Sequence, residues 1–283
     1  MPADGSLTVS ILAPSERHDA ILLAQVAPLV RELGTSPLLD SIYFERVNKP
    51  EWGIRLRILG ERAWLDSEVR GLVERRAGSV AGRAAFVDDD AEDKWVGGLR
   101  EHERLKGIYH LDTVACLDLM ETEASGGLGT SRAQWSLLVV EELLDLFELR
   151  DAERLEFYRR GFQWAFDLGR WGADVLSVLE EKYEAQRGAL GAALDRGDGG
   201  LAVDAWGGPD PARIASAFLE SARKPIAALV AAGGAQELGR SPMDFAGFVV
   251  HAHSNRLGIH ATQEAAVRYL VRRAHGGPRP PGP

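Results

Sequence analysis

The stretch SIYFERVNKPEWGIRLRIL, residues 41–59, carries the strongest strand signal in the chain. Residues 41–47 and 52–59 are rich in β-branched and aromatic side chains, the types that strands favour. The four residues between them, 48–51, include Asn and Pro, which are typical of turns. We therefore predict an antiparallel hairpin.

The elements around this hairpin form a strand-rich first part of the chain. Alternating apolar side chains predict an opening strand over 7–13. Helical spacing over 21–33 predicts a helix that Pro28 kinks or divides. The same patterns predict the other elements of this part: a helix over 62–77, a strand over 82–88, and a strand followed by a loop over 106–120.

From residue 131 onward the apolar residues recur at helical spacing. The predicted helices cover 131–148, 151–167, 170–195, 210–232, 242–257 and 261–274. Strands followed by helices indicate an α+β fold, with an antiparallel sheet in the first half packed against a largely helical second half. We expect one domain over 1–274, strand-rich over 7–120 and helical over 131–274, followed by a disordered tail over 275–283.

Composition excludes several classes of protein. The 283 residues include 33 Lys+Arg and 42 Asp+Glu, a net charge of −9, and 45% of the residues are hydrophobic. Such a chain builds a full core and is expected to be soluble, with no membrane span and no nucleic acid as its main partner. Cys116 is the only cysteine, which excludes an intramolecular disulfide. The N-terminus lacks the pattern of a signal peptide, so we expect a cytoplasmic protein.

Two arginines project together from the second strand of the hairpin. Alternation places Arg55 and Arg57 on the face opposite Ile54, Leu56 and Ile58. Neighbouring guanidiniums are stabilised by carboxylates, by carbonyls or by an anionic ligand. Two interpretations stay open: a ligand-gripping pair, or a solvated sheet face neutralised by acids such as Glu45.

A second constellation lies in SPMDFAGFVVHAHSNRLGI, residues 241–259. Ser241 and Pro242 are typical of a helix start, and Gly258 can end the helix. At 100° per residue, His251 and Asn255 share one shoulder of the apolar stripe, and His253 lies on the other. His251 is thus either a general base or a histidine hydrogen-bonded at the edge of the core.

Other signals favour ordinary structural roles. His251 and His253 point to different sides of the helix, so a metal site is not expected. The glycines at 126, 127 and 129 lack the spacing of a nucleotide-binding loop and are interpreted as a flexible loop. Spacing identifies no activating base for Cys116.

Taken in order, three motifs resemble the thiopeptide-type bacteriocin biosynthesis domain, which is also the elimination domain of lantibiotic dehydratases. Residues 43–46 and 55–57 are similar to its FFIRY…HLRLR pattern. Residues 251–258, HAHSNRLG, are similar to its closing HxHxNRLG pattern, which an acid-containing helix bearing Glu264 follows. Residues 121–127, ETEASGG, stand where the family tends to have EIERYGG.

The resemblance implies one of two activities on a modified ribosomal peptide. Elimination domains remove glutamate from glutamylated Ser or Thr, whereas stand-alone pyridine synthases join two dehydroalanines by a formal [4+2] aza-cycloaddition and expel water and the leader peptide. Here Ala124 and Ser125 replace the Arg-Tyr pair of the elimination pattern, so one arginine expected to hold glutamate is missing. The 283 residues also leave no room for a glutamylation domain. Both features favour a pyridine synthase without a cofactor.

The resemblance also implies roles for named residues. His251 is the candidate for proton transfer, with Asn255 and Arg256 orienting it or the peptide. Arg55 and Arg57 would stabilise charge on amide oxygens. The further candidates are Tyr43, Tyr109 and Glu121 for hydrogen bonding or proton relay, and His253 for substrate binding.

Two rival functions stay open. One is a glutamate-elimination lyase of a split dehydratase, and the other is a non-catalytic partner that binds a leader peptide. In each case the expected partner is a precursor peptide with its leader, together with other biosynthetic enzymes, and the sequence does not specify an oligomeric state.

Overall fold

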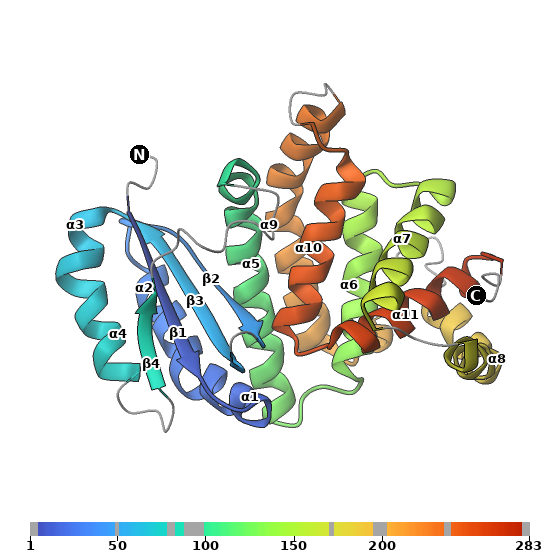
Figure 1. The fold of residues 1–283 in the computed structure, drawn as a ribbon, viewed down its shortest axis with the longest axis horizontal. Helices are drawn as coiled ribbons and strands as arrows, with labels where there is room; N and C mark the ends of the chain where they lie inside the picture. Colours follow the sequence, from blue (N-terminus) through green and yellow to red (C-terminus); the bar gives the residue numbers. More distant parts are fainter. Residues whose placement is uncertain are drawn as a thin grey trace. The chain divides into compact units, whose positions relative to one another are not determined.

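The computed structural model describes residues 5–48, 51–77, 83–87, 99–169, 173–194, 203–234 and 239–278. The chain divides into two compact units, residues 1–125 and 126–283, and each is described by itself. Figure 1 shows the strands in the blue-to-teal first part of the chain and helices throughout the second part. The predicted α+β class is confirmed.

The first unit contains a four-stranded antiparallel sheet. Its strands are β1 (Gly5–Leu12), β2 (Leu39–Val47), β3 (Gly53–Gly60) and β4 (Arg83–Val87), in the order β2-β3-β1-β4. β2 and β3 pair as neighbours, as the hairpin prediction requires. Their shared register sets Tyr43 opposite Arg57 and Glu45 opposite Arg55.

One face of this sheet is apolar and is covered by two helical segments. The first consists of α1 (His18–Ile21), a π-helical turn (Leu22–Val26) and α2 (Ala27–Gly34). The second consists of α3 (Arg62–Trp64), a π-helical turn (Leu65–Val69) and α4 (Arg70–Ala77). Pro28 is the second residue after the π-helical turn, within a helical segment that continues from His18 to Gly34, so the wider turn accommodates its missing N–H and the segment is not divided.

Residues 106–120 are helical, so the predicted strand and loop are wrong. They belong to α5 (Leu99–Ala124). The buried residues of α5 recur at helical spacing: Leu105, Ile108, Tyr109, Asp112, Cys116, Leu119 and Met120. The β-branched and aromatic residues that suggested a strand are satisfied in a long helix, because tertiary packing outweighs small differences in propensity.

α5 also covers an edge of the sheet. β2 is an outer strand, and the Nδ1 atom of His110 lies 3.3 Å from the nitrogen of Ile42 and 3.1 Å from its oxygen. Burial lowers the pKa of His110, which favours the neutral ring. Nδ1 forms one of these two hydrogen bonds at a time. Without a proton it accepts from the N–H of Ile42, and with a proton it donates to the carbonyl of Ile42.

The second unit is helical. Its elements are α6 (Arg132–Leu146), α7 (Asp151–Gly169), α8 (Ala173–Leu194), a 3₁₀ turn (Val203–Trp206), α9 (Pro209–Gly234), α10 (Pro242–Arg256) and α11 (Ala261–Ala274). Each predicted helix after residue 131 is present. α11 packs against α7 and α8, and α6 packs against α9 and α10.

The described part of the predicted tail is held against α11. Arg272 Nη1 donates to the carbonyl of Pro278 at 2.9 Å, and Arg273 Nη1 donates to that of Gly277 at 2.7 Å. Residues 279–283 lie outside the described residues. Of the helices within the described ranges, none combines the length and the apolar character needed to cross a bilayer.

Candidate active site

α10 begins and ends as its sequence predicts. The side chain of Ser241 accepts from the backbone of Asp244, whose carboxylate accepts from the backbone of Ser241, which forms a capping box. Pro242 occupies the first turn, and Gly258 ends the helix with a φ of 75°. These ends fix the helix that carries the histidine motif.

The two histidines of α10 have opposite environments. The side chain of His251 is 48% exposed, whereas His253 is fully buried. The His253 ring lies 5.7 Å from that of Trp135 and is stacked on Phe218 at 6.4 Å. The predicted difference between the two faces is confirmed, and the surroundings of His253 favour packing over substrate binding.

His251 is held by an acid from the next helix. Its Nδ1 atom lies 2.9 Å from Oε2 of Glu264, in the first turn of α11. The other carboxylate oxygen, Oε1, accepts from Nε of Arg268 at 3.1 Å and also from its Nη2. Glu264 and Arg268 are 6% and 7% exposed. A buried ion pair therefore anchors a half-exposed imidazole.

The electrostatics of Glu264 fix the role of each imidazole nitrogen. Burial raises the pKa of Glu264, but the Arg268 guanidinium and His251 outweigh it and lower the pKa to about 2. The carboxylate is ionised at neutral pH and can only accept, so Nδ1 of neutral His251 carries the proton. Nε2 then keeps its lone pair, as a general base requires.

Glu264 and Arg268 are absent from the site residues predicted from the sequence. Asn255 and Arg256 were expected to orient the imidazole, but a carboxylate thirteen positions after His251 holds Nδ1. Arg256 is fully buried in α10, and Asn255 lies one turn after His251. The available signal was the spacing of Glu264 and Arg268, because acid and base four residues apart pair on one helix.

The polar face of the sheet gathers a second group of predicted residues. It carries Arg55 and Arg57 of β3, Tyr43 and Glu45 of β2, and Thr8 and Ser10 of β1. Glu45 stands opposite Arg55, as the solvated-face interpretation expects, whereas Tyr43 stands opposite Arg57. The ring of Tyr43 is buried and lies 5.6 Å from that of Tyr109 on α5. The fold thus brings Tyr43, Tyr109 and Arg57 into one neighbourhood.

Glu121 has a different partner. Its carboxylate forms an ion pair with Arg31 of α2, which also lies 3.2 Å from Asp118. The bond to Glu121 raises the pKa of Arg31. This contact favours a role in joining α2 to α5 over the predicted proton relay.

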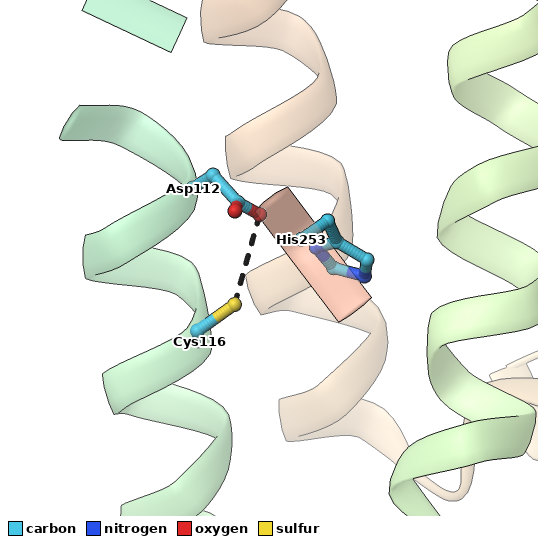
Figure 2. A group of neighbouring side chains, drawn as sticks. All are labelled: Asp112, Cys116 and His253. Carbon is cyan, nitrogen blue, oxygen red and sulfur yellow. Dashed lines mark hydrogen bonds between the residues drawn. The ribbon is translucent and has the colours of Figure 1, made fainter. Parts of the chain in front are cut away.

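Cys116 has a carboxylate neighbour that spacing did not reveal. Figure 2 shows Cys116 and Asp112 on successive turns of α5, and the dashed line marks the bond from Sγ to Oδ1, 3.6 Å long. Both side chains are buried. Figure 2 also draws His253, which belongs to α10.

The α+β fold and the histidine motif agree with a known family. The family model described as "Lantibiotic biosynthesis dehydratase C-term" matches residues 7–275. The chain belongs to this family, which confirms the resemblance found from the three motifs. Among curated proteins, none matches the chain.

Three solved structures share the fold. The tRNA-dependent lantibiotic dehydratase MibB from Microbispora sp. 107891 is 19% identical, with a TM-score of 0.69 over 97% of this chain and 28% of that one. TbtD, a pyridine synthase from thiomuracin biosynthesis, is 14% identical, with a TM-score of 0.71 over 96% of this chain and 97% of that one. TsrL is 16% identical, with a TM-score of 0.66 over 95% of this chain and 94% of that one.

Proposed function

We propose that the protein is a pyridine synthase that acts on a leader-bearing precursor peptide with two dehydroalanines. The observation that carries this proposal is the half-exposed His251, whose Nδ1 is anchored by the buried Glu264. Nε2 is not bonded to any residue that the structure describes, so the imidazole provides a base for a reaction made of proton transfers. No cofactor is part of the proposed reaction.

The proposed reaction needs no oxidant or reductant. An amide of one dehydroalanine tautomerises to an iminol, so that C=C and C=N form an azadiene. Two C–C bonds to the second alkene close a six-membered ring. Loss of water and of the leader as a carboxamide then gives the pyridine.

His251 is assigned the proton transfers of these steps. Nε2 takes the amide N–H proton and delivers it to the carbonyl oxygen, which gives the iminol. After ring closure, Nε2 takes a ring C–H proton in each elimination and returns it to the departing hydroxyl or to the leader amide nitrogen. General acid–base catalysis of this kind contributes about 10²–10⁴-fold. Folding the peptide so that the two alkenes meet contributes up to roughly 7–11 kcal/mol by proximity.

The polar face of the sheet is assigned to peptide binding. Arg55 and Arg57 project from one strand and present N–H groups suited to carbonyl oxygens that gain negative charge. The buried Tyr43, opposite Arg57, is the better placed of the tyrosines for a hydrogen bond in this group. Glu121 keeps its predicted relay role only if the peptide displaces Arg31.

Position 124 favours cycloaddition over glutamate elimination. Ala124 ends α5 and Ser125 follows it, where the elimination pattern has Arg-Tyr. The hydroxyl of Ser125 donates to the carbonyl of Thr122 at 2.9 Å. Elimination stays the second candidate because MibB, which shares the fold, is a dehydratase.

Incubation with a synthetic peptide tests the proposal. The purified protein receives a leader-bearing peptide with two dehydroalanines, and mass spectrometry follows the products. We expect the cyclised core and the leader carboxamide, and their absence would refute cycloaddition. A glutamylated peptide is the second substrate: release of glutamate would identify the elimination lyase. Failure with both substrates, together with tight leader binding, would identify the non-catalytic partner.

A further inference from the structure

Arg268 is a buried cation in contact with an acid and an aromatic ring. Its guanidinium binds Glu264 one turn earlier on α11 and lies over the ring of Phe157 on α7, with Cζ 4.8 Å from the ring centroid. A buried charge needs such partners, because an unpaired one is strongly destabilising. Glu264 supplies the negative charge and Phe157 supplies the face of an aromatic ring.

Gly161 makes room for this guanidinium. A Cβ at position 161 would lie 2.5 Å from Cζ of Arg268, a distance at which one side must move. A glycine inside a helix costs about 1 kcal/mol relative to alanine. The position of Arg268 is therefore the packing reason for a glycine at this point of α7.

The contacts of α7 with this network follow one stripe of the helix. Phe157, Gly161 and Trp164 are spaced four and three residues apart, so they share a face. Phe157 lies under Arg268, Gly161 leaves space for it, and the Trp164 ring stands edge-on to His251 at 5.3 Å. One face of α7 thus contacts both ends of the chain of bonds from Arg268 to His251.

Side chains of α6 and α7 beside the network are bonded to one another. Tyr158 of α7 bonds to Glu141 of α6, and Arg154 pairs with Glu141 at 2.6 Å. A small cavity of about 20 Å³ beside Glu264 and Arg268 has mostly apolar walls. The surroundings are therefore poor in water, which strengthens the bond between Glu264 and Arg268.

We propose that Arg268, seated in the space left by Gly161, is a positioning residue that holds Glu264 ionised and oriented, so that His251 keeps its proton on Nδ1 and its lone pair on Nε2. Arg268 does not contact the substrate in this role. The effect on turnover rests on the proposed function, whereas the effect on the His251 tautomer does not.

Imidazole ¹⁵N chemical shifts test the tautomer directly. In the unmodified protein we expect the Nδ1–H form of neutral His251 to predominate. In Arg268→Met it should become the minor form, because Glu264 loses the cation that keeps it charged. Because Arg268→Met leaves a buried carboxylate unpaired and is at risk of not folding, the double variant Glu264→Gln, Arg268→Met removes both charges and should show the same loss.

Two milder variants keep the charge and test the geometry. Arg268→Lys retains a cation but lacks the fork that reaches Oε1 with two N–H groups. Gly161→Ala retains Arg268 but fills its space. Both should keep the Nδ1–H form, because Glu264 stays ionised, but should lower kcat by about 100-fold with little change in KM, since misplacing a catalytic group by about 1 Å costs that much.

Gly188→Ala is the matched control. Gly188 lies in the interior of α8, where an added Cβ meets nothing within 4 Å, so the tautomer and kcat should stay unchanged. The proposal is overturned if Arg268→Met, or the double variant where the single one does not fold, keeps the Nδ1–H form. If the variants shift the tautomer but the unmodified protein processes neither test peptide, the positioning role stands and the proposed function fails.

Discussion

His251 has Nδ1 bonded to Glu264, and Nε2 bonds to none of the described residues and is assigned the proton transfer. Substitutions that imitate each nitrogen therefore separate binding from chemistry. Asn at this position places a polar atom near Nδ1, whereas Gln reaches toward the position of Nε2. Neither amide is a base at neutral pH. His251→Asn should therefore keep the contact with Glu264 and His251→Gln should lose it, whereas both variants should lose the catalytic base.

We predict that His251→Asn and His251→Gln both lower the rate of cyclised product by about 10²–10⁴-fold. Because the side chain is half-exposed, the free energy of unfolding should change by only about 0.5 kcal/mol in His251→Asn. Mass spectrometry of a time course and urea titration measure the two effects. Glu220→Gln, on an exposed side chain, is the control. A variant with more than half of the normal rate would contradict the assignment of His251.

Glu264 makes the stability of the protein depend on pH in the acid range. Its pKa is lowered from 4.5 to about 2, so its stabilising contribution is present above pH 4.5 and is lost as the pH falls toward 2. The shift corresponds to a loss on the order of 3 kcal/mol. We predict that the free energy of unfolding falls less steeply over this range in Glu264→Gln, and urea titrations at several pH values measure it. Equal slopes in the two proteins would show that Glu264 is not held ionised by Arg268.

At the scale of whole elements, the sequence predicts best where turn signals and periodicity agree. The helices of the second unit are bounded by Gly- and Pro-containing segments, and each was found where periodicity placed it. α5 was missed because residues 108–114 are rich in strand-forming types. His251 was found from its spacing on α10, but its partner was not, because Glu264 belongs to another helix and only tertiary packing brings them together.

Gly107 tests the helical assignment of α5. The residue is exposed, and an added Cβ meets nothing within 4 Å. In a helix interior, Gly107→Ala should raise the free energy of unfolding by about 0.5–1 kcal/mol, because alanine has the higher helix propensity. Chemical denaturation measures it. Gly53→Ala in β3 is the contrasting case, since its Cβ would lie 2.7 Å from the carbonyl oxygen of Ile11 and should destabilise. Destabilisation by Gly107→Ala would argue against the helix.

At the scale of the whole molecule, unfolding shows whether the two units are cooperative. The contacts divide the chain after Ser125, whereas the family model spans residues 7–275 without a break. We predicted one domain over 1–274, which corresponds to a single unfolding transition. Two substitutions, one in each unit, can report on this: Gly53→Ala in β3, and His275→Phe at the end of the second unit.

His275→Phe removes a specific contact of the second unit. His275 Nε2 lies 3.1 Å from Glu141 and its ring is stacked on Tyr158 at 6.1 Å, so phenylalanine keeps the stacking and leaves the buried acid with one partner fewer. The loss of such a bond costs about 1–3 kcal/mol. That cost should lower Tm by about 2–4 °C per kcal/mol.

If the chain is one cooperative domain, either substitution lowers a single calorimetric transition. Amide hydrogen exchange in peptides from β3 and from α11 should then accelerate together in both variants, because the slowest amides exchange through global unfolding. Gly188→Ala should leave both sets of peptides as protected as in the unmodified protein. If Gly53→Ala accelerates only β3 and His275→Phe accelerates only α11, the two units unfold independently. The family's α+β fold would then consist of two separately stable halves, and the prediction of one domain would be wrong.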